Sequence, residues 1–201
     1  GRRAGLERFF EVSKPKLVGR VLIDDDDPSY EGMTLPDNWA FFSRPRAKTT
    51  QILNRAFEAF PQQDFYAVVG DDMVCNPEGW DTILADESAP HYVAWGDDGR
   101  WGSKLCPSFF VGGDLVRVMG WIANPSFGHL YADSVWWMIA RGAGLGHYRP
   151  DVSMLHINQK DQTYMERQTR GDHDAFERLR ADGMSALIDR AHLFASSKVA
   201  A

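Results

Sequence analysis

Apolar positions along the chain fall into short runs typical of β-strands and longer stretches with helical spacing. Residues 17–23 and 65–69 are apolar runs rich in β-branched and aromatic side chains, and each is followed closely by consecutive aspartates. Between them, residues 48–60 carry apolar side chains at the spacing of an amphipathic helix, which Pro61 ends. We also expect strands at 39–42, 91–95, 109–111 and 152–157, and helices at 6–10, 133–141 and 172–193. The alternation of strand and helix predicts an α/β fold with a mostly parallel sheet flanked by helices.

The composition adds limits on size and location. A chain of 201 residues fits a single domain and can bury a hydrophobic core. Its formal net charge of −6 argues against a general basic surface for nucleic acid or anionic membranes, although local basic groups remain, such as Arg44, Arg46 and Lys48. Two cysteines make neither a disulfide framework nor a zinc site, so the reducing cytoplasm is the expected location. No apolar run approaches the roughly 20 residues that span a bilayer, so we expect no membrane partner, and no signal peptide is visible.

Two groups of aspartates follow the predicted strands, namely residues 24–27 and the pair Asp71 and Asp72. In open α/β sheets, ligands bind beyond the carboxyl ends of the strands. Clustered carboxylates repel one another unless a cation or hydrogen-bond donors compensate for their charge. Either group is therefore a candidate ligand site, although residues 24–27 also fit an exposed acidic turn before Pro28.

The order of these features resembles the GT-A fold (Rossmann-like) glycosyltransferases, especially members similar to family 2. The segments that carry the resemblance are VLIDDDDP, RPRAKTTQILNRAFEAFP, FYAVVGDDMVCNPEGWD, FFVGGDLVRVMGWI, LYADSVWWMIARGAG and VSMLHIN. The first and third of them look most like small glycosyltransferases encoded by bacteriophages, which would act in the host cytoplasm. The resemblance implies one glycosyltransferase domain over 1–201, with a nucleotide-binding half at 1–90, an acceptor and catalytic half at 91–165 and a helical tail at 166–201.

The resemblance assigns a nucleotide-sugar donor, by family default a UDP-sugar, to the first half of the chain. It implies that Asp24, or Asp25 in its place, contacts the base, and that Lys48 and Asn54 face the nucleotide. A lysine there also has a physical reason, because it offsets phosphate charge. Asn54 fits a solvated helix face equally well. Asp71 would contact the ribose or a metal-bound water.

The metal that the resemblance implies is Mn²⁺ or Mg²⁺, held by Asp72 and His156. The family's D-x-D motif reads Gly70-Asp71-Asp72 here, so the leading carboxylate is displaced or absent. A single histidine on an apolar strand is also a common core residue, which is the alternative for His156. A divalent cation at such a site neutralises the negative charge that grows on the leaving diphosphate.

The remaining roles concern the acceptor. Asp133 matches the second residue of the family's x-E-D motif and would be the general base, which predicts inversion at the anomeric carbon; retention would remove that role. An aspartate is also a good helix N-cap, and the two roles can coexist. Trp95, Asp97, Asp98 and Trp101 lie on the side where the family binds acceptors, although a Gly-rich hairpin turn explains them as well. The acceptor itself stays open, with modified DNA and protein among the candidates.

Two features leave the function open. Family members begin with a central strand, which is not seen before the first predicted helix. We therefore expect residues upstream of Gly1, another segment in that place, or an imperfect sheet. A sugar nucleotidyltransferase shares the fold and the metal chemistry, but it usually carries a Gly-rich phosphate loop near its start, and none is seen here. A non-catalytic module that binds nucleotide sugars or glycans would use the same carboxylates structurally.

Overall fold

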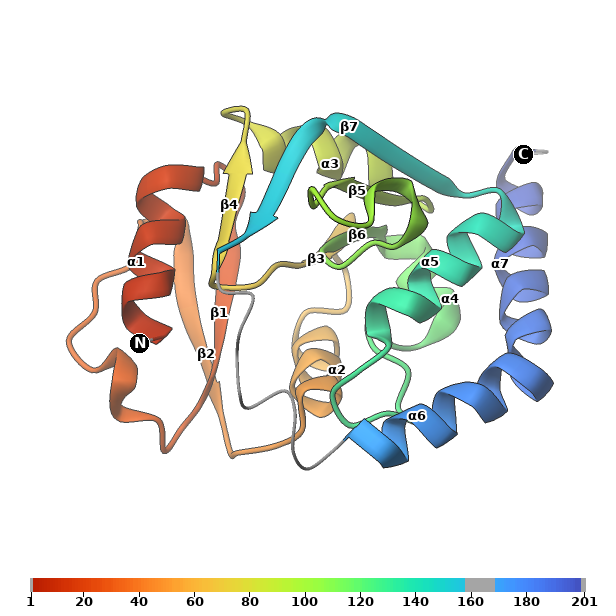
Figure 1. Ribbon diagram of the computed structural model, residues 1–201, viewed down its shortest axis with the longest axis horizontal. Coiled ribbons are helices and arrows are strands. Elements are labelled where there is room, and N and C mark those ends of the chain that lie inside the picture. The colour runs from red at the N-terminus through yellow and green to blue at the C-terminus, as the bar shows by residue number, and fades with distance from the viewer. Residues whose placement is uncertain (1, 158–168, 200–201) are drawn as a thin grey trace.

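The computed structural model describes residues 2–157 and 169–199 of the chain (Figure 1). Its strands are β1 (Gly19–Asp24), β2 (Trp39–Arg44), β3 (Phe65–Val68), β4 (Met73–Asn76), β5 (Val93–Asp97), β6 (Phe109–Gly112) and β7 (Gly146–His156). Its α-helices are α1 (Arg2–Ser13), α2 (Thr49–Ala59), α3 (Trp80–Ser88), α4 (Gly113–Met119), α5 (Ala132–Ala143), α6 (Thr169–Arg178) and α7 (Met184–Val199). Two short 3₁₀ turns, η1 (Pro28–Tyr30) and η2 (Gly102–Lys104), and a π-helical turn, η4 (Leu179–Gly183), are also present. The strands and helices expected from the sequence pattern are confirmed, with shifted ends, whereas β4, α3 and α4 were not expected.

Two hydrogen-bonded sheets form the framework of the fold. One has five strands in the order β3-β6-β5-β7-β4, and the other consists of β1 and β2, which run parallel to each other. Within the five-stranded sheet, β5 and β7 are parallel, and the other three neighbouring pairs are antiparallel. The fold is α/β as predicted, but its main sheet is mixed rather than mostly parallel.

The connections explain why the strands alternate in direction. Parallel neighbours need a crossover connection, which is usually a helix, whereas antiparallel neighbours do not. The 98–108 loop joins β5 to β6 without an α-helix, and β6 returns alongside β5 in the opposite direction. β4 starts five residues after β3 ends and pairs at the far edge of the sheet with β7.

The small sheet is separate from the five-stranded one. Within the described residues, β1 pairs with β2, and β3 pairs with β6. The two parallel strands β1 and β2 thus form a sheet of their own beside the larger one.

Side chains on the two faces of the five-stranded sheet belong to two separate clusters of the core. Successive strand residues point to opposite faces, so Val93 and Trp95 of β5 join one cluster while Ala94 joins the other. The first cluster includes the inner faces of α4, α5 and α7. The second packs Leu6 and Phe9 of α1 against the sheet. Figure 1 shows α1 at one end of the molecule and α5 and α7 at the other.

The C-terminal region is helical, as predicted, and it is an integral part of the core. Met184, Ala191 and Ala195 of α7 are buried in the cluster that also holds α4 and α5. Phe176 of α6 packs against the same cluster. Even α7, with 16 residues, does not reach the length of a membrane span, and no helix within the described part of the chain is both long and apolar enough to cross a membrane.

Candidate functional site

Three strands bring their carboxyl ends to the same edge of the five-stranded sheet. β3 and β5 point the same way because each is antiparallel to β6, and β7 is parallel to β5. Asp71 and Asp72 follow β3, Asp97 ends β5 and His156 ends β7. The sheet topology thus gathers acidic and imidazole groups that are far apart in sequence, in the position where open α/β sheets bind ligands.

Asp72 and His156 lie side by side at this edge. The ladder between β4 and β7 sets Met73 opposite His156, and the backbone N–H of Ile157 donates to the carbonyl of Asp72 at 2.9 Å. Nε2 of His156 is 3.7 Å from Oδ1 of Asp72. The side chain of His156 is 49% exposed and that of Asp72 is 27% exposed, so both can reach a ligand. We call these two residues the Asp72–His156 pair.

The donor set of the pair fits a divalent cation. Two atoms that each lie about 2.1 Å from one ion are about 3 Å apart at a right angle and about 4.2 Å apart when opposite. The 3.7 Å between Nε2 and Oδ1 lies within these limits. A carboxylate suits Mg²⁺ or Mn²⁺, and the imidazole favours the transition metal of the two. The pair would supply two ligands and leave the other positions to a ligand and water.

Gly70 allows the two side chains to come this close. A Cβ atom built on Gly70 would lie 2.8 Å from Oδ1 of Asp72 and 3.4 Å from Nε2 of His156. Any side chain at residue 70 would therefore press on the carboxylate and the ring. A glycine at residue 70 therefore has a local steric reason in this fold.

The four aspartates after β1 have different surroundings. Asp24 pairs with Arg46 at 3.3 Å through Oδ2, while its Oδ1 is buried and has no hydrogen-bond partner among the described residues. Asp26 forms a second ion pair with Arg46 at 2.9 Å. The hydrogen bond with Asp26, together with the charges of Asp26 and Asp24, raises the pKa of Arg46. Asp25 is exposed.

A pocket of about 640 Å³ opens between the end of β1 and the start of α2. We call it the β1–α2 pocket, and its lining residues are Leu22, Ile23, Asp24, Asp27, Tyr30, Arg46, Ala47, Lys48, Thr49, Gln51, Ile52, Leu53 and His129. The predicted nucleotide residues Asp24 and Lys48 line it together. Tyr30, Arg46 and His129 were not predicted, because the contacts that bring them here join segments far apart in the sequence.

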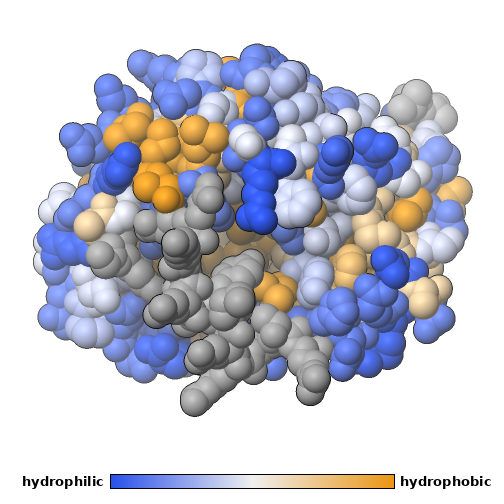
Figure 2. Space-filling model, viewed as in Figure 1, coloured by the Kyte–Doolittle hydropathy of each residue, from blue (hydrophilic) through white to orange (hydrophobic). Residues whose placement is uncertain are grey.

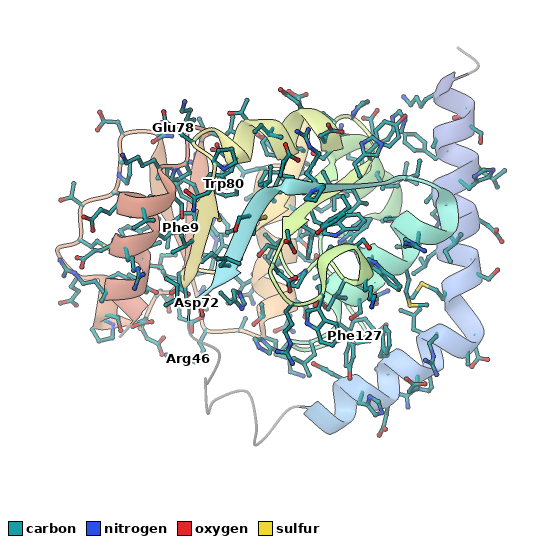
Figure 3. The ribbon with its side chains drawn as sticks, turned by 45° about the horizontal axis from the view of Figure 1, so that its top comes forward. Phe9, Arg46, Asp72, Glu78, Trp80 and Phe127 are labelled. Atoms are coloured by element: carbon teal, nitrogen blue, oxygen red, sulfur yellow. The ribbon has the colours of Figure 1, made fainter. Side chains whose placement is uncertain are left out.

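The β1–α2 pocket is connected to the sheet edge through Tyr30. This side chain lines the pocket, and its hydroxyl oxygen is 3.5 Å from Oδ2 of Asp71. Asp71 in turn precedes Asp72 of the Asp72–His156 pair. Figure 3 shows Asp72 and Arg46, the partner of Asp24, on the same side of the molecule. The structure thus places Asp24, Lys48, Asp71, Asp72 and His156 in one region.

Lys48 and His129 stand at the start of α2. Lys48 precedes the helix, and its backbone N–H donates to Oε1 of Gln51 at 3.1 Å. Oγ1 of Thr49 is 2.6 Å from Nδ1 of His129. Positive charge from Lys48 and Arg46 and the N-terminus of α2 make this end of the pocket favourable for an anion.

Asn54 has a structural role instead of the predicted nucleotide contact. Its Nδ2 donates to the carbonyl of Ala123 at 2.7 Å, and its Oδ1 accepts from the N–H groups of Ile122 and Ala123, both at 3.0 Å. Three of the four hydrogen bonds that an asparagine side chain can make are therefore formed with the backbone that follows α4. The neighbouring residues 51–53 line the β1–α2 pocket, whereas Asn54 does not.

Asp133 lies in the first turn of α5, close to the position of a cap. Its Oδ1 accepts from the backbone N–H of Ser134 at 2.7 Å, and Sγ of Cys106 donates to its carbonyl at 3.2 Å. Burial raises the pKa of Asp133, although the hydrogen bonds from Ser134 oppose this effect. Within the described residues, no hydrogen bond or ion pair joins Asp133 to the Asp72–His156 pair.

Residues 97–104 form a loop at the end of β5, which we call the 97–104 loop and which lies in space between β7 and α5. Two predicted acceptor residues of this loop, Asp97 and Asp98, have structural roles. Oδ1 of Asp98 accepts three backbone N–H groups of the loop, from residues 100–102, at 3.1, 2.7 and 3.0 Å. Asp97 accepts the N–H of Gly99 at 3.1 Å. Both carboxylates therefore stabilise the turn, as the Gly-rich hairpin alternative predicted.

The two tryptophans of this region differ sharply in exposure. Trp95 is 2% exposed and belongs to the core, and its Nε1 donates to the carbonyl of Gly102 at 3.1 Å. It cannot stack on an acceptor, so that prediction is corrected. Trp101 is 45% exposed and remains accessible. Leu155 of β7 is 43% exposed as well, and its Cδ2 would lie 3.0 Å from a Cβ atom built on Gly99 of the same loop. Figure 2 shows apolar surface gathering on one part of this view of the molecule.

Comparison with models of protein families and with the curated proteins finds no match for this chain. The function is therefore argued from the site itself.

Proposed function

We propose that this chain is a metal-dependent glycosyltransferase that moves a sugar from a nucleotide-sugar donor to an acceptor hydroxyl. The observation that carries the proposal is the Asp72–His156 pair, with 3.7 Å between Nε2 and Oδ1, together with the β1–α2 pocket, which Tyr30 connects to Asp71. Ligand sites for small molecules commonly measure about 300–1,000 Å³. The pocket of about 640 Å³ falls within that range.

The lining of the β1–α2 pocket suits the two chemically different ends of a nucleoside diphosphate. The buried and unpartnered Oδ1 of Asp24 is an acceptor for a base N–H, which is a feature of uracil. Arg46, Lys48 and the start of α2 supply positive charge for phosphate oxygens. Tyr30 leads from this pocket to Asp71, which we assign to the ribose or to a metal-bound water. A UDP-sugar is the donor that this arrangement favours.

The Asp72–His156 pair would hold Mn²⁺ or Mg²⁺, and the cation would offset the charge on the departing diphosphate. The residues of the chain have the remaining tasks. Lys48 and Arg46 bind phosphate oxygens, and Asp133 takes the proton from the acceptor hydroxyl. The raised pKa of Asp133 suits a base, because a carboxylate with a higher proton affinity removes a proton more readily.

The fold is compatible with a GT-A assignment. The interruption between the sheet of β1 and β2 and the five-stranded sheet is where a chain of this type would carry a further strand. The proposal includes that assignment, inversion at the anomeric carbon, and action in the cytoplasm, that of a host cell if a bacteriophage encodes the chain. Its acceptor, modified DNA or protein among the candidates, would meet the exposed Trp101 on the 97–104 loop.

The experiment that tests the proposal is release of nucleoside diphosphate from a panel of nucleotide sugars in the presence of Mn²⁺. The wild-type chain should hydrolyse or transfer one donor, with UDP as product, and chelation of the metal should abolish the release. Asp72→Ala should lose it because one metal ligand is gone, and Asp133→Ala should lose it because the base is gone. Asp151→Ala serves as the control, since this exposed carboxylate pairs with Arg149 outside the candidate site.

The same panel separates the alternatives. A sugar nucleotidyltransferase would make or consume a nucleoside triphosphate and a sugar phosphate instead of releasing the diphosphate. A non-catalytic module would bind a nucleotide sugar and release nothing. Activity that survives both Asp72→Ala and Asp133→Ala would contradict the assigned roles.

A further inference from the structure

The 124–131 loop, which joins α4 to α5, is attached to two other parts of the chain. From α2, Oγ1 of Thr50 donates to the carbonyl of Phe127 at 2.6 Å, and the backbone N–H of Thr50 donates to the carbonyl of Gly128 at 3.2 Å. From α6, Asp172 binds the other side of the loop. Figure 1 shows α6 beside the connection that enters α5.

Asp172 accepts three consecutive backbone N–H groups of this loop. Oδ1 accepts from Gly128 at 2.7 Å, and Oδ2 accepts from His129 at 2.8 Å and from Leu130 at 2.9 Å. The residue is 7% exposed, so these bonds are shielded from water. Three charge-assisted hydrogen bonds to one buried carboxylate therefore hold the backbone of residues 128–130 in place.

The residues on either side of this attachment belong to the candidate site. His129, whose N–H binds Asp172, presents its ring to Thr49 in the β1–α2 pocket. Tyr131 has a positive φ of 69°, stacks on Phe176 of α6 with ring centroids 4.3 Å apart, and directly precedes α5. α6 therefore holds both the histidine in the pocket and the start of the helix that carries Asp133.

We propose that Asp172 is a positioning residue for the candidate site: by binding the 128–130 backbone, it holds His129 in the β1–α2 pocket beside Lys48. The identity of the ligand in this pocket rests on the proposed function, whereas the geometry of the loop does not. The C-terminal helices would then contribute to donor binding, without touching the donor themselves.

The charges around Asp172 support this role. Burial opposes ionisation of the carboxyl, but the three backbone N–H groups and the nearby charge of Lys48 outweigh it and lower the pKa of Asp172. A Cβ atom built on Gly128 would lie 3.4 Å from Oδ1 of Asp172 and 3.5 Å from Nζ of Lys48, so the lysine reaches the carboxylate side of the loop. The charge of Lys48, which we assign to the donor phosphates, thus acts on Asp172.

The test uses the full chain with Asp172→Asn. Asparagine has nearly the same shape as aspartate, but it has one acceptor oxygen instead of two. Its NH₂ group would face backbone N–H groups that donate to the carboxylate in the wild type. Amide exchange at residues 128–130 should become at least about tenfold faster, and the dissociation constant for UDP with Mn²⁺ should rise at least about tenfold, the equivalent of one charge-assisted hydrogen bond. The NMR signals of the His129 ring should shift as its contact with Thr49 loosens.

Two further variants keep the result interpretable. Ile188→Ala removes a contact between α7 and Gly142 of α5, so it should lower stability while leaving the 128–130 amides and UDP binding within about twofold of wild type. Asp172→Glu keeps the charge but displaces it by one methylene group. It should give a smaller change of the same kind, and it replaces Asp172→Asn if that variant does not fold.

The outcomes separate this proposal from the proposed function. If wild type binds no UDP but Asp172→Asn speeds exchange and shifts the His129 signals, the function is overturned and the positioning of the loop stands. Wild-type UDP binding with unchanged exchange and affinity in Asp172→Asn overturns the positioning role and leaves the function intact. Faster exchange with unchanged UDP affinity also overturns it, because the loop would then be ordered by Asp172 without serving the pocket.

Discussion

Replacing Asn54 by alanine separates a structural asparagine from one that binds a nucleotide. Asn54 makes three hydrogen bonds with the backbone of residues 122 and 123, at 2.7, 3.0 and 3.0 Å. Ala123 is fully buried and Ile122 is 5% exposed, so water does not readily replace the lost partners. The variant Asn54→Ala therefore leaves two N–H groups and one carbonyl without partners.

The expected loss follows from these three groups. At about 1 to 1.5 kcal/mol for each of the three buried backbone groups left unpaired, the free energy of unfolding should fall by about 3 to 4.5 kcal/mol. For a chain of this size the midpoint of thermal unfolding should fall by roughly 10 °C, and that of urea unfolding by more than about 1 M. Affinity for UDP, measured at a temperature where the variant is folded, should stay within about twofold of wild type.

Glu58→Ala is the matched control, since Glu58 is an exposed residue of the same helix. It should change the free energy of unfolding by less than about 0.5 kcal/mol. The reasoning is refuted if Asn54→Ala unfolds like wild type, or if it keeps most of its stability and loses UDP binding. The second result would return Asn54 to the nucleotide site.

The other predictions concern the metal and the base. Asp72→Ala and His156→Ala should each weaken Mn²⁺ binding, measured by calorimetry, by about tenfold or more because each removes one ligand; equal binding in both variants and wild type would rule out the site. Gly70→Ala should weaken Mn²⁺ binding as well, because its Cβ would lie 2.8 Å from Oδ1 of Asp72; unchanged affinity would show that the carboxylate moves freely. Burial raises the pKa of Asp133, so its protonation favours the folded state, and the stability that it contributes is lost as pH rises through the folded pKa. Asp133→Asn should therefore raise the melting temperature at neutral pH while abolishing transfer, and a lower melting temperature there would contradict the assignment.

The direction of the strands could not be predicted from the pattern of the sequence. The apolar runs at 65–69 and 109–111 were read correctly as strands, because local alternation and turn residues are enough for that. Whether two strands pair in parallel depends on which surfaces meet after the whole chain has folded. β4, a four-residue strand directly after Asp72, is too short to show a period of its own, and its pairing with β7 joins segments about 80 residues apart.

The acceptor residues illustrate how an aromatic side chain is misread. Trp95, at the end of the strand expected at 91–95, was assigned to the acceptor side with the residues that follow it, yet β5 extends to Asp97 and Trp95 joins the same core cluster as Val93. Alternation with period two along residues 93–95 was the signal that would have identified the buried face. Trp101, beyond the end of the strand, was placed in a loop correctly and is exposed. Asp98 gave no comparable signal, since a carboxylate that accepts loop N–H groups and one that binds a sugar look alike in sequence.

Four residues of the candidate site and its surroundings could not be predicted from the sequence, namely Tyr30, Arg46, His129 and Asp172. Each reaches the candidate site through a contact with a distant segment, such as the 43 residues between His129 and Asp172 or the 80 between Thr49 and His129. Sequence spacing carries no information on such pairs without a known fold. Asp24, Lys48, Asp72 and His156, by contrast, stood at or next to the ends of predicted elements, where the chain leaves the sheet or enters a helix and where the general rule for α/β sheets applies.

The aspartates at 24–27 show how the structure divides work among identical residues. Asp24 is the last residue of β1, so its carboxylate still lies on the side of the strand that lines the β1–α2 pocket, and its Oδ1 is buried there. One residue later the chain has left the strand, and Asp25 is exposed. Asp26 binds Arg46 at the rim, and Asp27 accepts the N–H of Ser29 at 2.9 Å as the cap of η1. The acidic-turn and nucleotide-site interpretations thus apply to different aspartates of this run. Asp27 caps the turn, and Asp26 forms an ion pair with Arg46 at the edge of the pocket. Among the four aspartates, which all lie in the described part of the chain, Asp24 is the one that faces the pocket with an oxygen that has no hydrogen-bond partner. A base contact in the proposed donor site therefore falls to Asp24, and Asp25 is not its substitute.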